Sequence, residues 1–183
     1  GRILRSPLAH GRILNIDTSR AKKLYGVRAV LTGKDIPQKV YGAGSGGAPV
    51  PGAIPDEQIL CVEKVRYVGD PIAAVAAVDR DTAEEALQLI DFELEELPAV
   101  FSAEDALQPG ALLVHEWAKG NIYDHTVILK VGDVEQGFEE SYHVREDTYK
   151  THTMNHAPLE TRVCLADFDP CGKLTVWASS QAP

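Results

Sequence analysis

Three side chains that can bind a metal ion recur at every fourth position near the end of the chain: His152, His156 and Glu160. On a helix this spacing would place all three on one face. Pro158 would break such a helix, because proline lacks the backbone N–H and its ring clashes with the preceding turn. We therefore expect no metal site built from these residues alone.

A second polar group follows a predicted β-hairpin. An Asp-Pro-Cys-Gly turn separates Arg162–Phe168 from a second apolar run, a pattern typical of a hairpin with a four-residue connection. The residues expected on its apolar side are Val163, Leu165 and, as a further candidate, Phe168, with Leu174 and Val176 in the second strand. The polar residues at the end of the second strand are Ser179, Ser180 and Gln181.

No other pattern supplies a complete active site. The serines at 6, 179 and 180 lack the Gly-x-Ser-x-Gly setting of a hydrolase nucleophile. Prolines follow the glycines of Tyr41–Pro55, so no helix N-terminus is available for a phosphate, and we interpret this segment as a loop. The carboxylates from Glu84 to Glu96 alternate with apolar residues, which indicates a solvated face.

The composition excludes several classes of partner. The 183 residues carry a formal net charge of −9, without the basic cluster that binding to a nucleic acid or an anionic membrane requires. The longest apolar run, Pro71–Val78, is far shorter than the roughly 20 residues of a transmembrane helix. Three cysteines without a Cys-x-x-Cys pair predict reduced thiols in a cytoplasmic protein; a disulfide between Cys164 and Cys171 is the alternative.

The order of predicted elements indicates an α+β fold. The predicted strands are two within Gly1–Asp17, then Val27–Leu31, Ile59–Val62, Val65–Val68, Pro71–Val78, Asp91–Leu97, Thr126–Val131 and Tyr142–Thr153. The predicted helices are Ser19–Leu24 (capped by Asp17 or Thr18 and ended by Gly26), Thr82–Ile90 (from a Thr82/Glu85 capping box), Ala103–Leu107 and Asp133–Glu140. The run Pro71–Val78 should be a central strand covered on both faces, and its crossover to Asp91–Leu97 should be right-handed if the two strands are parallel.

The ends of the sequence indicate a piece of a longer protein. The chain begins at Gly1 without Met and is at once predicted as strand, and it ends at Pro183 directly after an apolar strand. Predicted structure becomes sparse between Pro109 and His125. We therefore expect one domain followed by part of another.

Several motifs occur in order along most of the chain. They are GRILRSPLAH at 1–10, ILNIDTS at 13–19, KVRYVGDPIAAVAAV at 64–78, D-x-x-T-A-E-E-A at 79–86 and EELPA at 95–99. Together they resemble the start of the large molybdenum-binding subunit of the xanthine dehydrogenase and aldehyde oxidase family. The resemblance implies an α/β hammerhead domain over 1–115, with a mixed sheet and two or three helices, and then the first β-hairpin of a truncated molybdopterin-binding domain over 116–183.

The resemblance also implies roles for individual residues. By position, Gln181 is the Gln of the family's S/T-x-Q motif, whose amide lies beside an oxo ligand of molybdenum. Glu160, in the family's L-E-T, is implied to be a buried hydrogen-bonding anchor and not a catalyst. The family's Gly-Gly-x-Gly-Gly loop, its other pterin contacts and its base glutamate do not occur in this sequence. We therefore expect no catalytic residue, metal ligand or bound cofactor in this fragment alone, which would act as a scaffold.

The complete subunit is expected to bind the molybdopterin cofactor and to hydroxylate or reduce an electron-poor carbon of a small-molecule substrate. Iron-sulfur clusters and FAD in partner domains or subunits would carry the electrons, within a homo-oligomeric complex. The N-terminal Arg-Ser-Pro and Gly-Asp-Pro stretches are most similar to 4-hydroxybenzoyl-CoA reductase, whereas H-A-P-L-E-T and S-S-Q-A-P are closer to the carbon monoxide dehydrogenase large chain. The substrate therefore stays open. The alternative of another class is a non-catalytic interaction or binding module with hammerhead topology.

Overall fold

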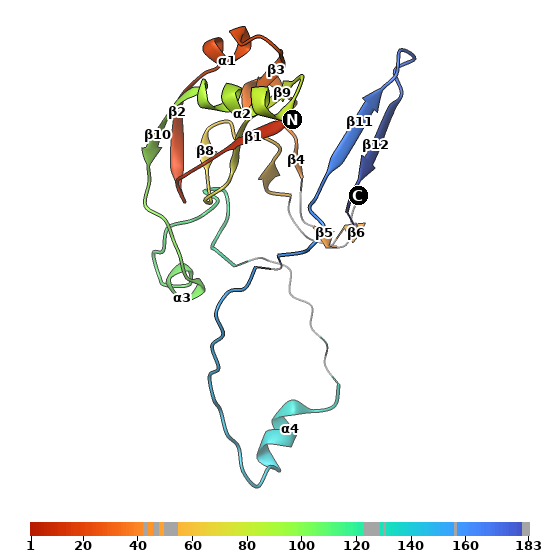
Figure 1. The fold of residues 1–183 in the computed structure, drawn as a ribbon. Helices are drawn as coiled ribbons and strands as arrows, with labels where there is room; N and C mark the ends of the chain where they lie inside the picture. Colours follow the sequence, from red (N-terminus) through yellow and green to blue (C-terminus); the bar gives the residue numbers. More distant parts are fainter. Residues whose placement is uncertain are drawn as a thin grey trace. The chain divides into compact units, whose positions relative to one another are not determined.

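The computed structural model describes residues 1–41, 55–122, 129, 131–155 and 157–180, together with the backbone of 44–45 and 48–49 (Figure 1). The chain divides into two compact units. The first consists of Gly1–Ala43 and Gly52–Asp124, and the second consists of Gly44–Pro51 and His125–Pro183. Among the helices of the described residues, none is long and apolar enough to cross a membrane.

The first unit is organised around β9, Pro71–Ala77, which lies between β1, Arg2–Arg5, and β3, Val27–Thr32. Both pairings are antiparallel. Side chains of a strand alternate between the two faces of the sheet, and β9 is buried on both, since Ile72 and Ala73 are each fully enclosed. The predicted central strand is therefore confirmed.

Two helices cover one face of this sheet. They are α1, Ser19–Lys23, and α2, Arg80–Gln88 (Figure 1). The buried residues between helices and sheet are mostly small, which permits close approach: Ala21, Val30, Ala73, Val75, Ala83, Ala86 and Ile90. Asp79, not the predicted Thr82, caps α2, because its carboxylate accepts a 2.8 Å hydrogen bond from the Thr82 N–H. The helix therefore begins earlier than the Thr82/Glu85 capping box predicted.

A second sheet packs on the other side of β9. Its order is β10, Asp91–Glu96, then β2, Gly11–Asp17, then β8, Lys64–Val65, all antiparallel. The buried residues between the two sheets are Cys61, Val65 and Ile72, with partly buried Leu4, Ile13, Ile16, Phe92 and Leu94 against them. Since β9 and β10 belong to different sheets, the condition for a right-handed crossover, that the two strands are parallel neighbours, is not met.

Shorter elements complete the first unit. Its remaining elements are the 3-10 helix η1, Gly33–Asp35, the paired strands β4, Val40–Tyr41, and β7, Glu57–Gln58, and the helix α3, Ala103–Ala106. The predicted strand Ile59–Val62 is wrong, because no described strand includes these residues. Of the predicted strand Val65–Val68 only Val65 lies in a strand, β8, because the chain turns between Arg66 and Asp70.

The second unit contains β5, Gly44–Ser45, paired with β6, Ala48–Pro49, the helix α4, Val134–Glu139, and a hairpin of β11, Cys164–Phe168, and β12, Leu174–Ala178. The predicted hairpin and the predicted helix Asp133–Glu140 are thus found. The predicted strand Tyr142–Thr153 is not, since no described residue provides the hydrogen-bonding partner that a strand needs. Most of the predicted strand Thr126–Val131 lies outside the described residues.

The pairing of residues in the hairpin shows that the predicted assignment of side chains to its two faces was partly wrong. Directly paired residues share a face, so one face is formed entirely by apolar residues: Cys164, Ala166, Phe168, Leu174, Val176 and Ala178. Leu165 pairs with Trp177 on the opposite face, so it does not lie beside Phe168 as expected. Cys164 pairs with Ala178 and is a free thiol, as is Cys171 in the turn, so the alternative disulfide is absent.

The α+β class is confirmed, and among its described residues the first unit carries three α-helices, where two or three were expected. The sheets differ from the prediction. Pairings between the described strands are antiparallel and are distributed over small sheets, in place of one mixed sheet.

Candidate functional site

Gln181, the residue that the family resemblance places beside the molybdenum, lies outside the described residues, as does His156. The chain that leads to Gln181 is described up to Ser180. The Ser179 hydroxyl accepts a 2.8 Å hydrogen bond from the Val163 N–H and lies 3.2 Å from the Thr161 carbonyl. The Ser179 hydroxyl therefore makes its hydrogen bonds to the backbone, and these bonds hold the end of the hairpin in place.

Of the three residues with metal-ligand spacing, for which no metal site was expected, His152 and Glu160 are described. His152 and Glu160 are both exposed. Among the described residues no group of three or more His, Cys, Asp and Glu side chains is placed to hold a metal ion. The expected role of Glu160 as a buried anchor in the complete subunit stays a prediction.

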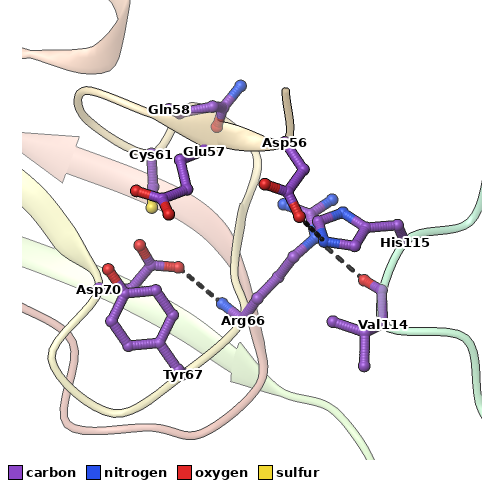
Figure 2. A pocket seen from close by; sticks show the side chains of 9 residues that line it. All are labelled: Asp56, Glu57, Gln58, Cys61, Arg66, Tyr67, Asp70, Val114 and His115. Atoms are coloured by element: carbon purple, nitrogen blue, oxygen red, sulfur yellow. Dashed lines mark hydrogen bonds and ion pairs between the residues drawn. The ribbon is translucent and has the colours of Figure 1, made fainter. Parts of the chain in front are cut away.

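The structure instead brings polar side chains together in a cleft of the first unit, with a volume of about 290 Å³ (Figure 2). Nine residues line it: Asp56, Glu57, Gln58, Cys61, Arg66, Tyr67, Asp70, Val114 and His115. They come from β7 and the residues that flank it, from the turn between β8 and β9, and from the segment that follows α3. We call it the Asp70 cleft.

Asp70 is the structural centre of this cleft and is only 7% exposed. Its carboxylate accepts a 2.8 Å hydrogen bond from the Arg66 N–H, and its carbonyl accepts one of 2.9 Å from the Ser6 N–H. The Gly69 N–H in turn donates to the Ser6 carbonyl at 2.8 Å. These bonds tie the turn to the end of β1, and Pro71 then starts β9.

The Arg66 guanidinium turns away from Asp70, as Figure 2 shows. Its Nε donates to the Val114 carbonyl at 3.0 Å, and its Nη2 lies 3.4 Å from Glu116. Glu116 also pairs with the Lys64 ammonium. The hydrogen bond from Lys64 is the largest cause that lowers the pKa of Glu116, to about 2. This cluster attaches the segment around Glu116 to the sheet.

The cleft is acidic, because the carboxylates of Asp56, Glu57 and Asp70 line it with Arg66 as the one arginine or lysine among its lining residues. His115 Nε2 lies 3.2 Å from Asp56, and the ring centroids of His115 and Trp117 lie 5.3 Å apart with their planes tilted by 37°. Burial raises the pKa of Tyr67, and the charge of Asp70 adds to the effect. Burial, followed by hydrogen bonding to Asp70, raises the pKa of the Cys61 thiol.

The chemistry of the Asp70 cleft follows from these shifts. Cys61 stays a neutral thiol at physiological pH, so it is a poor nucleophile. The Asp56–His115 pair has no hydroxyl or thiol partner among the described hydrogen bonds, so a nucleophilic triad is not formed there. The described geometry suits a structural and binding role. Local sequence patterns predict only a turn at Gly69-Asp70-Pro71, and none of them predicts its contacts with residues 6 and 61.

Comparisons with known proteins place the chain in a family. Residues 1–98 match the profile described as "Aldehyde oxidase and xanthine dehydrogenase, a/b hammerhead domain", and residues 114–183 match the "Molybdopterin cofactor-binding domain". The first match spans more than half of the chain. The chain therefore belongs to the aldehyde oxidase and xanthine dehydrogenase family, as its sequence motifs predicted.

Individual relatives agree with this assignment. The chain is 42% identical to a probable xanthine dehydrogenase subunit of Bacillus subtilis, over 99% of the chain and 23% of the relative. It is 38% identical to the nicotinate dehydrogenase large molybdopterin subunit of Eubacterium barkeri, over 99% of the chain and 40% of the relative. Its structure resembles the aldehyde oxidoreductase of Desulfovibrio gigas with a TM-score of 0.82 and 30% identity, over 98% of the chain and 20% of that protein. The chain thus spans between a fifth and two fifths of these relatives.

Proposed function

We propose that the chain is part of the large molybdopterin-binding subunit of a molybdenum hydroxylase, and that the fragment itself serves as a scaffold. The observation that carries this proposal is the order of the two profile matches, a hammerhead domain followed by the beginning of a cofactor-binding domain. The names and greater length of the relatives favour it over a stand-alone binding module. The boundary between residues 115 and 116 is our proposal for where the two domains meet.

The described residues do not themselves fit the cofactor. The hairpin β11–β12 is exposed on both faces, and nothing described encloses a pterin. When bound in the complete subunit, the molybdenum cofactor would supply the oxidation or reduction of an electron-poor carbon. We derive no step of that reaction from this chain.

Gln181 is the residue that we propose to contact the cofactor. The support is its place in the Ser179-Ser180-Gln181 motif, directly after a strand whose end is fixed by Ser179. A neutral amide can donate a hydrogen bond to a metal-oxo group without adding charge. No other residue of this chain is proposed at the cofactor.

A nitrogen heteroaromatic is the substrate class that we propose. Two relatives are named for xanthine and nicotinate, which are both small nitrogen-containing aromatic compounds. We further propose that iron-sulfur and flavin domains or subunits accept the electrons, and that the complex is a cytoplasmic homo-oligomer. The free cysteines support a reducing compartment.

The experiment is an activity assay on the full-length subunit, purified with the proteins that accompany it. We expect reduction of an artificial electron acceptor that depends on xanthine, nicotinate or a related heteroaromatic. A full-length subunit that carries its full cofactor load but is inactive on the whole panel would overturn the substrate proposal. A reading frame that stops directly after Pro183 would overturn the proposal of an enzyme.

A further inference from the structure

Residues 112–117, which follow α3, form a segment that we call the strap. Two of its residues, Val114 and His115, line the Asp70 cleft. Three others line a second cavity of about 280 Å³: Leu112, Leu113 and Glu116. The whole strap belongs to the first unit. It therefore contributes to the wall of both spaces.

Polar side chains hold the strap to the turn that follows β8. Arg66 Nε donates a 3.0 Å hydrogen bond to the Val114 carbonyl, and Figure 2 shows this side chain reaching across the Asp70 cleft. The Glu116 carboxylate pairs with the Lys64 ammonium and lies 3.4 Å from Arg66 Nη2. Glu116 thus bridges two cations of the same turn, and it is the main ionic attachment of the strap.

Buried apolar packing does not add to this attachment. Among the described residues, the two core clusters of the first unit and the partly buried residues against them include none from 112–117. His115 adds only a polar contact, with its Nε2 3.2 Å from Asp56. Glu116 is 52% exposed, and exposed ion pairs contribute little stability. Segments held in this way open locally at a much lower cost than global unfolding.

The strap keeps its own shape through Asn121. The Asn121 Nδ2 donates to the carbonyls of Leu112, at 2.8 Å, and of Ala106, at 3.1 Å. Its Oδ1 accepts a 3.0 Å hydrogen bond from the Val114 N–H. All of these bonds lie within the loop that starts at the end of α3. The loop can therefore stay closed on itself while its contacts with Lys64 and Arg66 are broken.

We infer that the strap is an ionic latch, which opens as a unit when the contacts of Glu116 with Lys64 and Arg66 break. Opening withdraws Leu113 from the apolar wall that it forms with Leu97, and this admits solvent and small solutes to the second cavity. Ionic strength controls the latch, because salt screens exposed charges. This inference does not depend on the proposed redox function.

The test is the rate at which iodoacetamide alkylates Leu113→Cys in the full-length protein, followed by peptide mass spectrometry. Position 113 is half-buried in the closed strap, so its thiol reacts mainly after opening. We expect Glu116→Gln to speed this alkylation by roughly threefold to fivefold, as for the loss of an exposed ion pair. Lys119→Cys, at an exposed position of the same loop, is the matched control reporter, and its rate should not change. Equal rates for Leu113→Cys with and without Glu116→Gln would overturn the inference.

Salt separates opening of the latch from a general loosening of the fold. Raising the ionic strength from about 0.01 M to about 1 M shortens the Debye length from roughly 30 Å to roughly 3 Å. This change should speed alkylation of Leu113→Cys while Glu116 is present, and should have a much smaller effect in Glu116→Gln. A salt effect of the same size in both backgrounds would contradict the latch. Leu112→Cys lines the same cavity and is the second reporter if Leu113→Cys folds poorly.

Amide hydrogen exchange tests whether the strap moves as a unit, without an introduced cysteine. The Val114 N–H is bonded to Asn121 within the loop, so Glu116→Gln should leave its exchange rate unchanged. Asn121→Ala removes this acceptor and should raise the rate. Equal acceleration in the two variants would show that the strap unravels, and would overturn its movement as a unit.

Discussion

The backbone N–H of Arg66 donates a 2.8 Å hydrogen bond to Oδ2 of Asp70, and this bond closes the turn that leads into the central strand β9. Because the Asp70 backbone also pairs with Ser6 at the end of β1, one residue links two strands of the first sheet through its turn. The Asp70 cleft is therefore part of the hammerhead scaffold as well as a surface feature.

Asp70→Ala should destabilise the first unit. The substitution leaves the Arg66 N–H without its acceptor in a site that is 7% exposed. We expect the free energy of unfolding to fall by about 1–3 kcal/mol, the usual effect of a buried donor losing its partner. Urea denaturation measures the change. Glu85→Ala, at an exposed position of α2, is the control, and an equal effect of the two substitutions would contradict the proposed role of Asp70.

Gly33→Ala should also destabilise the chain, for a steric reason. A Cβ atom added at Gly33 would overlap the Cys61 carbonyl, and backbone atoms cannot move aside cheaply. We expect a loss of about 1–3 kcal/mol in the free energy of unfolding, as for other overpacked sites. Gly120→Ala is the matched control, because a Cβ there meets no described atom within 4 Å. Similar thermal midpoints for both variants would show that η1 does not need glycine.

Glu116 should contribute stability that depends on pH. Its pKa in the folded chain is lowered to about 2 from its usual 4.5, with the Lys64 hydrogen bond as the largest cause. A lowered carboxyl pKa stabilises the fold above the usual value, and this contribution is lost as the pH falls from about 4.5 towards 2. The Glu116 side chain is 52% exposed, so the effect should be small and weakened by salt.

The check is the urea midpoint of the wild-type chain and of Glu116→Gln as a function of pH. We expect the wild type to be more stable near neutral pH and the two curves to converge near pH 2. Glu93→Gln is the control, since the structure shows no ion pair for Glu93 among the described residues. Parallel curves for Glu116→Gln and the wild type would rule out the paired carboxylate.

The apolar face of the hairpin should be covered in the full-length subunit. Val176 lies on the all-apolar face, whereas its neighbour Thr175 lies on the other and pairs with Asp167. In the full-length protein we expect Val176→Lys to lower the soluble yield severalfold, because it would bury a charge, and Thr175→Lys to have little effect. Equal yields of the two variants would indicate that this face stays in water.

Gln181→Ala should lower turnover of the full-length enzyme without loss of molybdenum. We expect a decrease of roughly tenfold, corresponding to one hydrogen bond made to the cofactor. Molybdenum content by mass spectrometry separates this effect from loss of the cofactor. Gln88→Ala, at an exposed position of α2, is the control. Unchanged turnover of Gln181→Ala would remove the residue from the cofactor site.

Local patterns predicted the elements whose signals lie within one segment. The apolar run that forms β9, the three- and four-residue spacing of Ala83 and Ala86 in α2, and the turn of the hairpin each determine their own structure. The motifs in the first hundred residues also predicted the family. Asp79 was missed as the cap of α2 because Thr82 offered a competing capping pattern within the same turn.

Features that depend on distant contacts could not be predicted in this way. The Asp70 cleft joins residues near 6, 61, 66 and 115, and His10 meets Pro98 across the sheet, so neither has a signature in the local sequence. The segment Tyr142–Thr153 has the alternation of a strand, but a strand forms only with a hydrogen-bonding partner. Alternation indicates which face a residue would take, and it does not supply that partner.

The most direct measurement is the molybdenum and pterin content of the full-length protein, measured on one purified sample by elemental mass spectrometry and by fluorescence of the released pterin. We expect one molybdenum and one pterin cofactor per polypeptide. A full-length, folded protein that contains neither, even when produced in cells that make the cofactor, would contradict the assignment to a molybdenum hydroxylase.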